Sequence, residues 1–443
     1  MPDPLVVRDL TEFTGLLAGD EAWLERVREY VRPCDHVVRL GEAERDEDDV
    51  IVRRDERGQW QAGRYIGELA FEGRRLVITP RLGEPVVEQW LGEVFNLIAP
   101  PHTAARRDRS PFIARVMGAV WCRVLAEASR HGPPTLRRHH GVEGLHLRGR
   151  LDIRRTVRLR VGGSPHVASV SSFRDLDNPV SRVVVAAERA LRGQIGHDQW
   201  HTPRVRELLP QMRAAVGSRP ALRDARALAR IRYTPITLPF KALADLSWRI
   251  ARLEGLSADN DDGDSEGLLL DVAELWELFL LHTLRRALPH LTVEHPTTGT
   301  GRTWLMTSND GRIGLGRLKP DLLVRDYAGE VVAVLDAKYK RLRDAWPARP
   351  RGVERSDIYQ MTSYLTRYAA DGARLGGLLY PLDPAQQQPA SAEARGPWSL
   401  AGGQRVVFAR VPLAPDAAAA ALVQLLAHED PGATLPAGLA APA

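Results

Sequence analysis

Residues 318–340 constrain this chain more than any other stretch, because they read LKPDLLVRDYAGEVVAVLDAKYK. Two runs rich in apolar and β-branched residues flank a turn at 327–330, which predicts neighbouring strands over 321–324 and 331–339. Successive side chains of a strand point to opposite faces, so Asp336 and Lys338 project to the same side. Asp321 opens the first strand and can bring a second carboxylate to that spot.

Two carboxylates beside a lysine suit the metal-assisted hydrolysis of a phosphodiester. Mg²⁺ takes oxygen ligands and keeps several waters, and a lysine can orient a metal-bound water or stabilise charge on a phosphate oxygen. The alternative is an ordinary salt bridge in a β-hairpin. Lysine usage favours the catalytic hypothesis: the chain has 61 basic residues, of which only Lys241, Lys319, Lys338 and Lys340 are lysines. A lysine retained in this stretch indicates a position where a guanidinium will not serve.

Several strings in the chain resemble those of a known family. Pro320-Asp321 followed by Asp336-Ala337-Lys338 is similar to the PD-(D/E)xK nuclease motif. The longer string LDAKYK, followed by DIYQM at 357–361, resembles the McrC family, the nuclease subunit of McrBC modification-dependent restriction systems. The strings LRGRL at 147–151 and RDLDNP at 174–179 extend the resemblance toward the N-terminus.

The resemblance implies a set of site residues. The Mg²⁺ ligands, which would also accept Mn²⁺, would be Asp321, Asp336 and the carbonyl of Ala337. The other catalytic residues would be Lys338, which assists the attacking water, and two positioning residues, Glu277 and Gln360. Glu277 also stands out by itself, because it lies deep in an apolar helical run and a buried carboxylate is costly unless it is paired or placed near a metal.

The resemblance also implies a fold and a partner. Residues 268–413 would form an α/β PD-(D/E)xK nuclease domain with a mixed central sheet, after an α+β N-terminal half that is β-rich and then helical. The substrate would be double-stranded DNA carrying 5-methylcytosine. The partner would be a McrB-like AAA+ ring that hydrolyses GTP and is stimulated by this chain. Since the chain has no G-x-x-x-x-G-K-[ST] loop, GTP would be bound by the partner.

Composition is that of a soluble globular protein, with 44% hydrophobic and 26% charged residues among 443. The N-terminus lacks the features of a signal peptide, and no apolar run reaches the roughly 18 residues of a membrane helix, so we expect a cytoplasmic protein. Cys34 and Cys122 are too far apart to suggest a metal pair or a disulfide framework. The net charge of +5 fits nucleic-acid contact without requiring it.

Residues 1–110 are expected to form a β-rich module, to which the resemblance assigns the docking of the partner, and residues 111–256 a mixed helical region with a basic strand. The patterns predict strands at 50–52, 64–71 and 75–80, and helices at 87–98, 112–128, 180–191, 205–216 and 238–253. Asn178 is placed to cap the helix at 180–191, with Pro179 at its first position.

A basic segment lies at 137–160, with eight arginines against Glu143 and Asp152. Apolar and basic residues alternate over 157–161, which predicts a strand with one solvated basic face. That face can neutralise phosphates, contact an acidic partner or simply be solvated. The candidate nucleic-acid contacts are Arg148, Arg150, Arg158, Arg160 and, beside the acid–lysine pair, Lys340.

Residues 257–267 read as a flexible acidic linker, and the apolar run after them predicts a helix over 268–288. Its acidic stripe is either part of the metal site or solvated, or paired with Arg285 or Arg286. Ser356 can cap a later helix that carries Gln360 and Tyr364. Strands are expected at 377–380 and 406–409, with Gln386–Gln388 in a loop between them. A short helix and an Ala/Pro-rich tail are expected at 414–443.

Two other functions stay open. One is a PD-(D/E)xK nuclease of another defence or repair system, with a different motor. The other is a non-catalytic activator or bridging subunit of an AAA+ motor. An intact set of Asp321, Asp336 and Lys338 argues against the second, because a scaffold needs no metal site.

Overall fold

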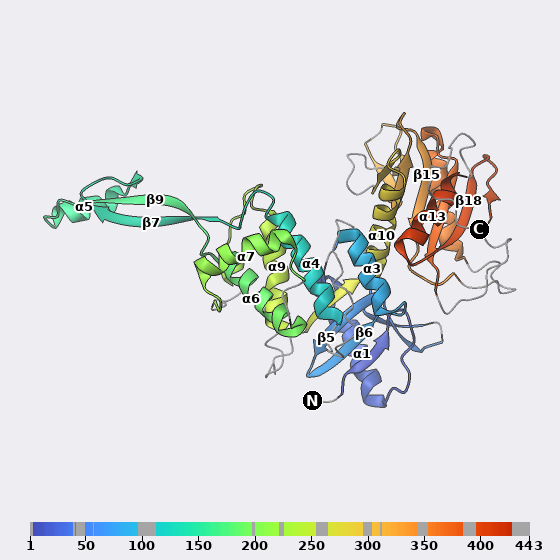
Figure 1. The fold of residues 1–443 in the computed structure, drawn as a ribbon, viewed down its shortest axis with the longest axis horizontal. Helices are drawn as coiled ribbons and strands as arrows, with labels where there is room; N and C mark the ends of the chain where they lie inside the picture. Colours follow the sequence, from blue (N-terminus) through green and yellow to red (C-terminus); the bar gives the residue numbers. More distant parts are fainter. Residues whose placement is uncertain are drawn as a thin grey trace. The chain divides into compact units, whose positions relative to one another are not determined.

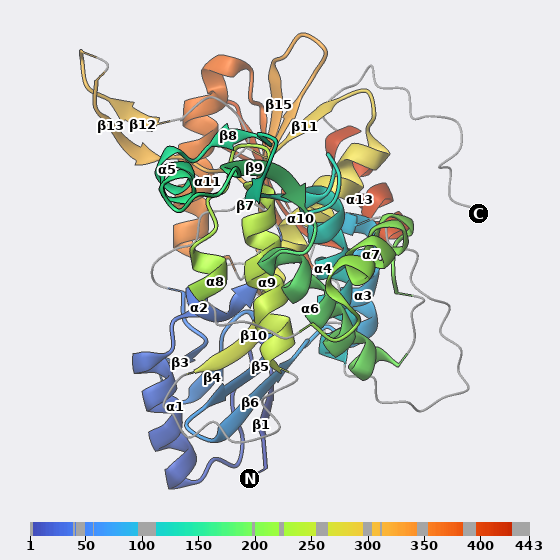
Figure 2. The same cartoon turned by 90° about the vertical axis from the view of Figure 1, so that its left-hand side faces the viewer.

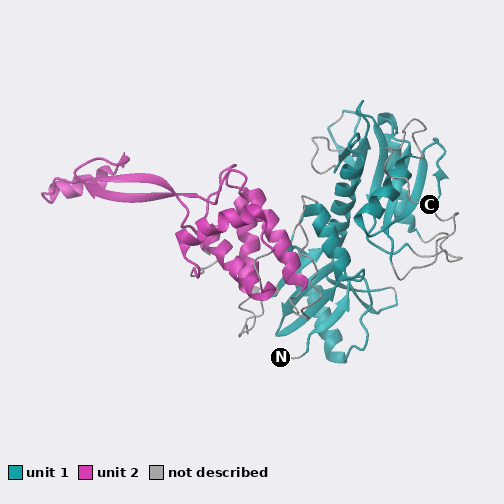
Figure 3. Cartoon of the chain, viewed as in Figure 1, with its two compact units in different colours: residues 1–101, 261–443 teal, residues 102–260 magenta. Residues whose placement is uncertain are grey.

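The computed structural model describes most of the chain, in two compact units (Figure 3). One unit combines residues 1–101 with 261–443, and the other is formed by residues 102–260. The residues described are 3–38, 40, 49–55, 57–95, 112–196, 200–220, 226–253, 265–295, 304–310, 312–342, 353–383 and 396–427. The expected loop at Gln386–Gln388, the tail beyond 427 and most of the expected linker lie outside them.

The N-terminal part of the first unit is built around a five-stranded sheet in the order β1-β6-β5-β10-β2 (Figure 2). Its strands are β1 (Leu5–Arg8), β2 (Val37–Val38), β5 (Tyr65–Phe71), β6 (Arg74–Thr79) and β10 (Glu266–Asp271). The other elements here are α1 (Ala18–Tyr30), α2 (Pro33–His36), β3 (Val52–Arg54) and β4 (Trp60–Ala62). Trp23, Trp60 and Tyr65 are almost fully buried in its core. The predicted strands in this region are thus present, with the first shifted to 52–54.

The fourth strand of this sheet comes from a distant part of the chain. β10 runs antiparallel to β5 and parallel to β2, although the sequence predicted linker and then helix for these residues. Leu268, Leu269 and Leu270 are buried in the sheet instead. A short run of leucines suits a buried strand as well as a buried helix, so periodicity did not separate the two.

Asp271 marks the change from strand to helix. It ends β10, and its side chain accepts hydrogen bonds from the backbone of Ala273 and Glu274, so it is the N-cap of α10 (Val272–Ala287). An aspartate oxygen at this position satisfies backbone N–H groups that the first helical turn leaves unpaired. The predicted helix therefore begins four residues later than expected, and Asp271 lies before its first turn.

The C-terminal part of the first unit contains a six-stranded mixed sheet in the order β11-β14-β15-β16-β18-β17. β14 and β15 are antiparallel, whereas β15, β16 and β18 are parallel. The strands are β11 (Thr292–Glu294), β14 (Leu322–Arg325), β15 (Val331–Ala337), β16 (Leu375–Pro381), β17 (Trp398–Ser399) and β18 (Arg405–Val411). The expected mixed sheet is confirmed, and the predicted strand at 331–339 ends at Ala337.

Helices accompany this sheet (Figure 1). They are α3 (Glu84–Phe95), α10, α11 (Arg355–Tyr368), the short 3₁₀ turn η3 (Ala369–Asp371) and α13 (Pro415–Ala427), and a separate hairpin is formed by β12 (Trp304–Thr307) and β13 (Gly314–Arg317). α10 packs against both α3 and α13. The N-cap of α11 is Glu354, without a side-chain hydrogen bond, so the predicted cap Ser356 is wrong and lies inside the helix.

The second unit contains a helical body and an arm. The body consists of α4 (Phe112–Ala128), α6 (Pro179–Ile195), α7 (Pro203–Val216), α8 (Arg226–Ala229) and α9 (Pro239–Leu253). The predicted cap of α6 is confirmed, because Asn178 accepts hydrogen bonds from Val180 and Ser181 and Pro179 opens the helix. The arm, residues 136–175, consists of β7 (Leu136–Gly144), β8 (Arg150–Leu151), α5 (Ile153–Val161) and β9 (Val167–Asp175).

The expected basic strand at 157–161 is wrong, because these residues belong to α5. Asp152 caps this helix by accepting a hydrogen bond from the backbone of Arg155. Ile153, Val157 and Val161 recur every four residues and are all exposed. Over five residues, the apolar pattern at 157–161 fits the period of a strand as well as that of a helix. The N-cap at Asp152 favours the helix, because it satisfies a backbone N–H of the first turn. Among the described residues, no helix is long and apolar enough to cross a membrane.

Candidate active site

The structure brings Asp336 and Lys338 together at the end of β15. Lys338 Nζ lies 2.5 Å from Asp336 Oδ2. Asp336 is 1% exposed, and burial raises its pKa while Lys338 opposes that rise. Burial by itself would lower the pKa of Lys338, but the Asp336 carboxylate raises it above the ordinary value. Lys338 is therefore an ammonium at neutral pH in the metal-free protein.

Asp321 reaches the same place from the start of β14. Its Oδ2 accepts a hydrogen bond of 2.6 Å from the backbone N–H of Ala337, and β14 pairs with β15 so that Leu322 lies opposite Leu335. The pKa of Asp321 is raised well above its usual range, first by burial and then by the charges of Asp336 and Glu277. One carboxylate thus faces another across the ladder, with one oxygen held by the backbone.

Glu277 is the third acid of this group and comes from α10. Burial raises its pKa to about 8, and the nearby charges of Asp271, Glu274 and Asp336 add to the effect. His295 Nε2 lies 3.9 Å from Glu277 Oε2. The expected alternative, a pairing with Arg285 or Arg286, is not what the structure contains. Arg285 donates to the carbonyl of Val293, and Arg286 contacts Glu93 and Asp416.

Asp321, Asp336 and Glu277 together place more negative charge in a desolvated space than Lys338 can neutralise. Each of the three has a raised pKa, and burial is the largest cause in every case. A divalent cation with oxygen ligands fits that excess. Within the described parts of the chain, no group of three or more acidic, histidine or cysteine side chains is placed so that it could hold a metal ion by itself. Two carboxylates and a carbonyl are an open ligand set, which suits an ion that keeps several waters.

Gln360 is joined to Lys338 by a chain of hydrogen bonds. Lys338 Nζ donates to Gln360 Oε1 at 2.9 Å, and Gln360 Nε2 donates to the hydroxyl of Tyr364 at 2.8 Å. The Tyr364 hydroxyl in turn donates to the carbonyl of Lys319 at 2.8 Å. Because each donor has one acceptor, the chain fixes the orientation of the Gln360 amide, with its oxygen toward the lysine.

Asp357 belongs to the same cluster, although the sequence did not single it out as a site residue. It lies in the first turn of α11, is 5% exposed, and contacts the ammonium groups of both Lys338 and Lys340. The signal that could have revealed it is its place one helical turn before Gln360, which puts both side chains on one face of the helix.

The N-terminal sheet also contributes to the surroundings of the site. Arg64, just before β5, donates from Nε to Asp271 Oδ2 at 3.1 Å and from Nη2 to Asp49 Oδ2 at 2.6 Å. Its positive charge partly offsets the rise in the pKa of Glu277. The residue after Lys338, Tyr339, is buried against Arg81, which follows β6. Neither arginine carries a local sequence signal of this role.

The predicted nucleic-acid contacts fall in different places. Lys340 lies beside the site and pairs with Glu354 and Asp357, both at 2.8 Å. The remaining four lie on the arm of the other unit, Arg148 before β8, Arg150 in β8, and Arg158 and Arg160 in α5. His139 and His140 are exposed on β7.

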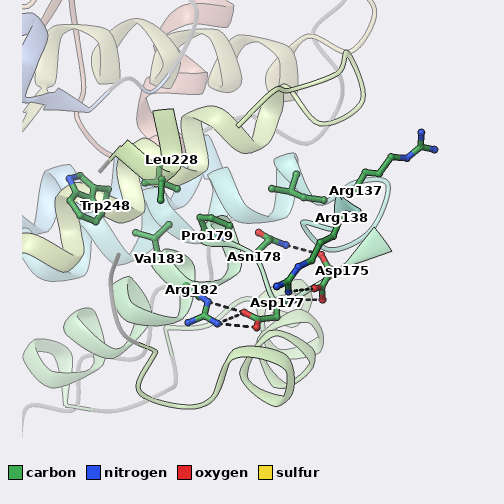
Figure 4. Close-up of a pocket in the computed structure, with 12 residues that line it drawn as sticks. Arg137, Arg138, Asp175, Asp177, Asn178, Pro179, Arg182, Val183, Leu228 and Trp248 are labelled. Carbon is green, nitrogen blue, oxygen red and sulfur yellow. Dashed lines mark hydrogen bonds and ion pairs between the residues drawn. The ribbon is translucent and has the colours of Figure 1, made fainter. Parts of the chain in front are cut away.

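A pocket of about 390 Å³ lies where the arm joins the helical body (Figure 4). Arg138 on β7 pairs with Asp175 on β9 at 3.0 Å, and the guanidinium of Arg182 donates hydrogen bonds to both carboxylate oxygens of Asp177. The RDLDNP string therefore has a structural use here, since it ends β9, caps α6 and ties the root of the arm to that helix. Its acids are each paired with arginine, and the hydrogen bond from Arg138 lowers the pKa of Asp175.

The fold and the site together define a mixed α/β protein in which buried carboxylates and a lysine meet at the end of a central strand. The chain belongs to the McrBC 5-methylcytosine restriction system component family, whose model matches residues 60–381. No match was found among curated proteins.

Solved structures give a further comparison. The chain is similar to one in the refined half-complex from a tetradecameric assembly of Thermococcus gammatolerans McrB AAA+ hexamers with bound McrC. That match has a TM-score of 0.53 and 18% identity, and covers 95% of this chain and 99% of the other. A second match, to a chain of the Thermococcus gammatolerans McrBC complex, has a TM-score of 0.36 and 18% identity, and covers 65% of this chain and 88% of the other. At this identity the first match shows a shared fold.

Proposed function

We propose that this chain is the Mg²⁺-dependent DNA endonuclease subunit of a modification-dependent restriction complex. Residues 268–413 would be its PD-(D/E)xK nuclease domain. The observation that carries the proposal is the cluster of the buried Asp336 with the half-buried Asp321 and Glu277 beside one protonated lysine. Such a concentration of like charge destabilises the metal-free protein, so it is expected where function requires it.

Asp321 and Asp336 would hold the metal together with the carbonyl of Ala337. When bound, Mg²⁺, or Mn²⁺ in its place, would supply an activated water and would polarise the scissile phosphate. The backbone N–H of Ala337 holds one oxygen of Asp321, which leaves its other oxygen for the metal. Glu277, with its raised pKa, would contribute from the side of α10, by positioning water rather than by direct ligation.

Lys338 would act as a fixed positive charge and hydrogen-bond donor. To act as a general base, Lys338 would first have to lose its proton. The Asp336 carboxylate opposes that loss, because it raises the pKa of the lysine. Its ammonium would orient the attacking water and stabilise the charge that develops on phosphate oxygens. Gln360 would hold Lys338 in place through the 2.9 Å hydrogen bond, and its amide is itself fixed by Tyr364.

Family membership supports a McrB-like AAA+ GTPase ring as the partner. The similar chain of known structure comes from McrB AAA+ hexamers with bound McrC. In this chain the partner would bind GTP and recognise the modified cytosine, while the present chain would stimulate GTP hydrolysis and cut DNA. The basic residues of the arm are candidates for contact with DNA phosphates.

The test is cleavage of methylated and unmethylated DNA with Mg²⁺, with and without the neighbouring AAA+ protein and GTP. Wild type is compared with Asp336→Ala and with Asp326→Asn, a matched control in the exposed turn between the same two strands. We expect cleavage that needs methylation, partner and GTP, and that is lost in Asp336→Ala alone. If wild type and Asp336→Ala are both inert while partner GTPase activity still rises, the chain is an activator and not a nuclease.

A further inference from the structure

Lys338 occupies the carboxylate that the proposed metal needs. Its Nζ lies 2.5 Å from Asp336 Oδ2, an oxygen that is buried and has no other hydrogen-bond partner among the described residues. A metal bound to Asp336 would then lie close to an ammonium of the same sign of charge. Metal and lysine therefore compete for one side chain, unless the lysine has another anion to turn to.

Asp357 is that second anion. Its Oδ1 lies 3.8 Å from Lys338 Nζ, a distance longer than a hydrogen bond but within the reach of a small movement of the flexible lysine side chain. Lys338 thus lies between two carboxylates, one on β15 and one on α11, and at present it is bonded to the first. Gln360 is on the same helix as Asp357 and accepts a hydrogen bond from Lys338 at 2.9 Å.

The orientation of Asp357 is fixed from its other side. Its Oδ2 pairs with Lys340 Nζ at 2.8 Å, and the hydroxyl of Tyr380 on β16 donates to the same oxygen at 3.4 Å. Both partners hold Oδ2, so Oδ1 is left facing Lys338. Because Asp357 is already buried and paired with Lys340, accepting the Lys338 ammonium requires no new desolvation of a carboxylate.

We propose that Asp357 is a positioning residue that receives the Lys338 ammonium when Asp336 binds the divalent metal. The inference rests on the proposed function, which supplies the metal. It assigns to Asp357 a role in metal affinity, exerted through Lys338 and not through direct ligation. It also explains why an acid is buried one helical turn before the positioning residue Gln360.

The experiment is a double-mutant cycle on metal binding by the full chain without DNA. Mn²⁺ is titrated calorimetrically into wild type, Asp357→Asn, Lys338→Met and the double variant. We expect Asp357→Asn to weaken Mn²⁺ binding about tenfold in the wild-type background and at most about twofold when Lys338 is already methionine. An acid that acts only through its own charge, or only by holding the fold, would weaken binding by the same factor in both backgrounds, and that result would overturn the proposal.

Two further measurements keep the result interpretable. Lys340→Met breaks the ion pair that holds Asp357 Oδ2. An equal loss of Mn²⁺ affinity in Lys340→Met and Asp357→Asn, with no coupling to Lys338, would mean that Asp357 only joins α11 to the end of β15. If Asp357→Asn unfolds, Asp357→Ser replaces it in the cycle. Wild type that binds no Mn²⁺ would overturn the proposed function as well, whereas binding without coupling would overturn only the role of Asp357.

Discussion

The guanidinium carbon of Arg81 lies 4.7 Å from the centre of the Tyr339 ring. Arg81 follows the last strand of the N-terminal hairpin β5–β6, and Tyr339 directly follows Lys338, so the N-terminal sheet contacts the strand that carries the candidate site. Arg81 is 1% exposed as a side chain and pairs with Asp9 and Asp383, each at 3.5 Å. The two sheets of the first unit therefore share a buried ionic cluster.

Replacing Arg81 by methionine should destabilise the first unit strongly. Asp9 would lose its cation while remaining fully buried, whereas Asp383 would keep Arg341 at 2.8 Å. A buried charge left without its partner typically costs about 3–5 kcal/mol.

Urea unfolding measures this loss of stability. The control is Arg26→Met, because the exposed pair of Arg26 with Glu72 is worth about 1 kcal/mol or less. Asp9→Asn combined with Arg81→Met should recover part of the loss. Equal effects of Arg81→Met and Arg26→Met would contradict this account of the cluster.

The stability of the metal-free protein should fall as pH rises, in part because of Glu277. Its pKa in the folded chain is about 8, against an ordinary value of 4.5. Between those values the folded state holds a proton that the unfolded chain has released, so the free energy of unfolding falls with rising pH, by at most about 1.4 kcal/mol per pH unit. The contribution is complete below pH 4.5 and lost above the folded pKa.

Glu277→Gln should flatten that slope, since glutamine has no proton to lose. The measurement is urea unfolding of both proteins in the presence of a chelator across this pH window. Asp321 and Asp336 also have raised pKa values and remain in the variant, so part of the slope should persist. The difference between the curves reports Glu277 together with its effect on the pKa of Asp321. Parallel curves for wild type and Glu277→Gln would mean that this carboxyl titrates normally in the fold.

Loss of the Gln360 amide should slow DNA cleavage with little effect on stability. Gln360→Ala removes the acceptor of the 2.9 Å hydrogen bond from Lys338, and we expect the rate at saturating Mg²⁺ to fall about a hundredfold, as on loss of one fixed polar group in an active site. Tyr364→Phe, which keeps the glutamine but frees its amide, should have a smaller effect in the same direction. Ser363→Ala on the same helix is the control, because the Ser363 hydroxyl donates to the backbone carbonyl of Tyr359 and its side chain is partly exposed. A rate for Gln360→Ala equal to that of Ser363→Ala would remove Gln360 from the site.

Local signals in the sequence were reliable where a cap or a strict period decided the structure. Asn178 and Pro179 begin α6 as predicted, and the period of two along β15 placed Asp336 and Lys338 on one side. Where two periods fit equally, prediction failed. Leu268 to Leu270 suited helix and strand alike, and what decides for the strand is pairing with β5, a partner far away in the sequence.

The surroundings of the candidate site were beyond prediction for the same reason. Asp357 gains its proposed role from two lysines that follow β15, and Arg81 packs against a tyrosine two residues beyond the same strand. Nothing in the residues next to either one reports such a contact. Burial of a charge is decided by tertiary packing, so sequence patterns alone single out the acids of the candidate site but not the groups that hold them in place.

The arm offers the last prediction, because its arginines lie on an exposed helix. If Arg158 and Arg160 contact DNA phosphates, Arg158→Gln with Arg160→Gln should weaken DNA binding by a similar factor for all sequences. The slope of log affinity against log salt should fall by about 2, or about 1 per lost contact. The control is Arg130→Gln, an exposed arginine of the helical body whose side chain is 73% accessible. An unchanged slope together with reduced stimulation of the partner GTPase would assign these two arginines of α5 to an acidic protein surface instead of to DNA.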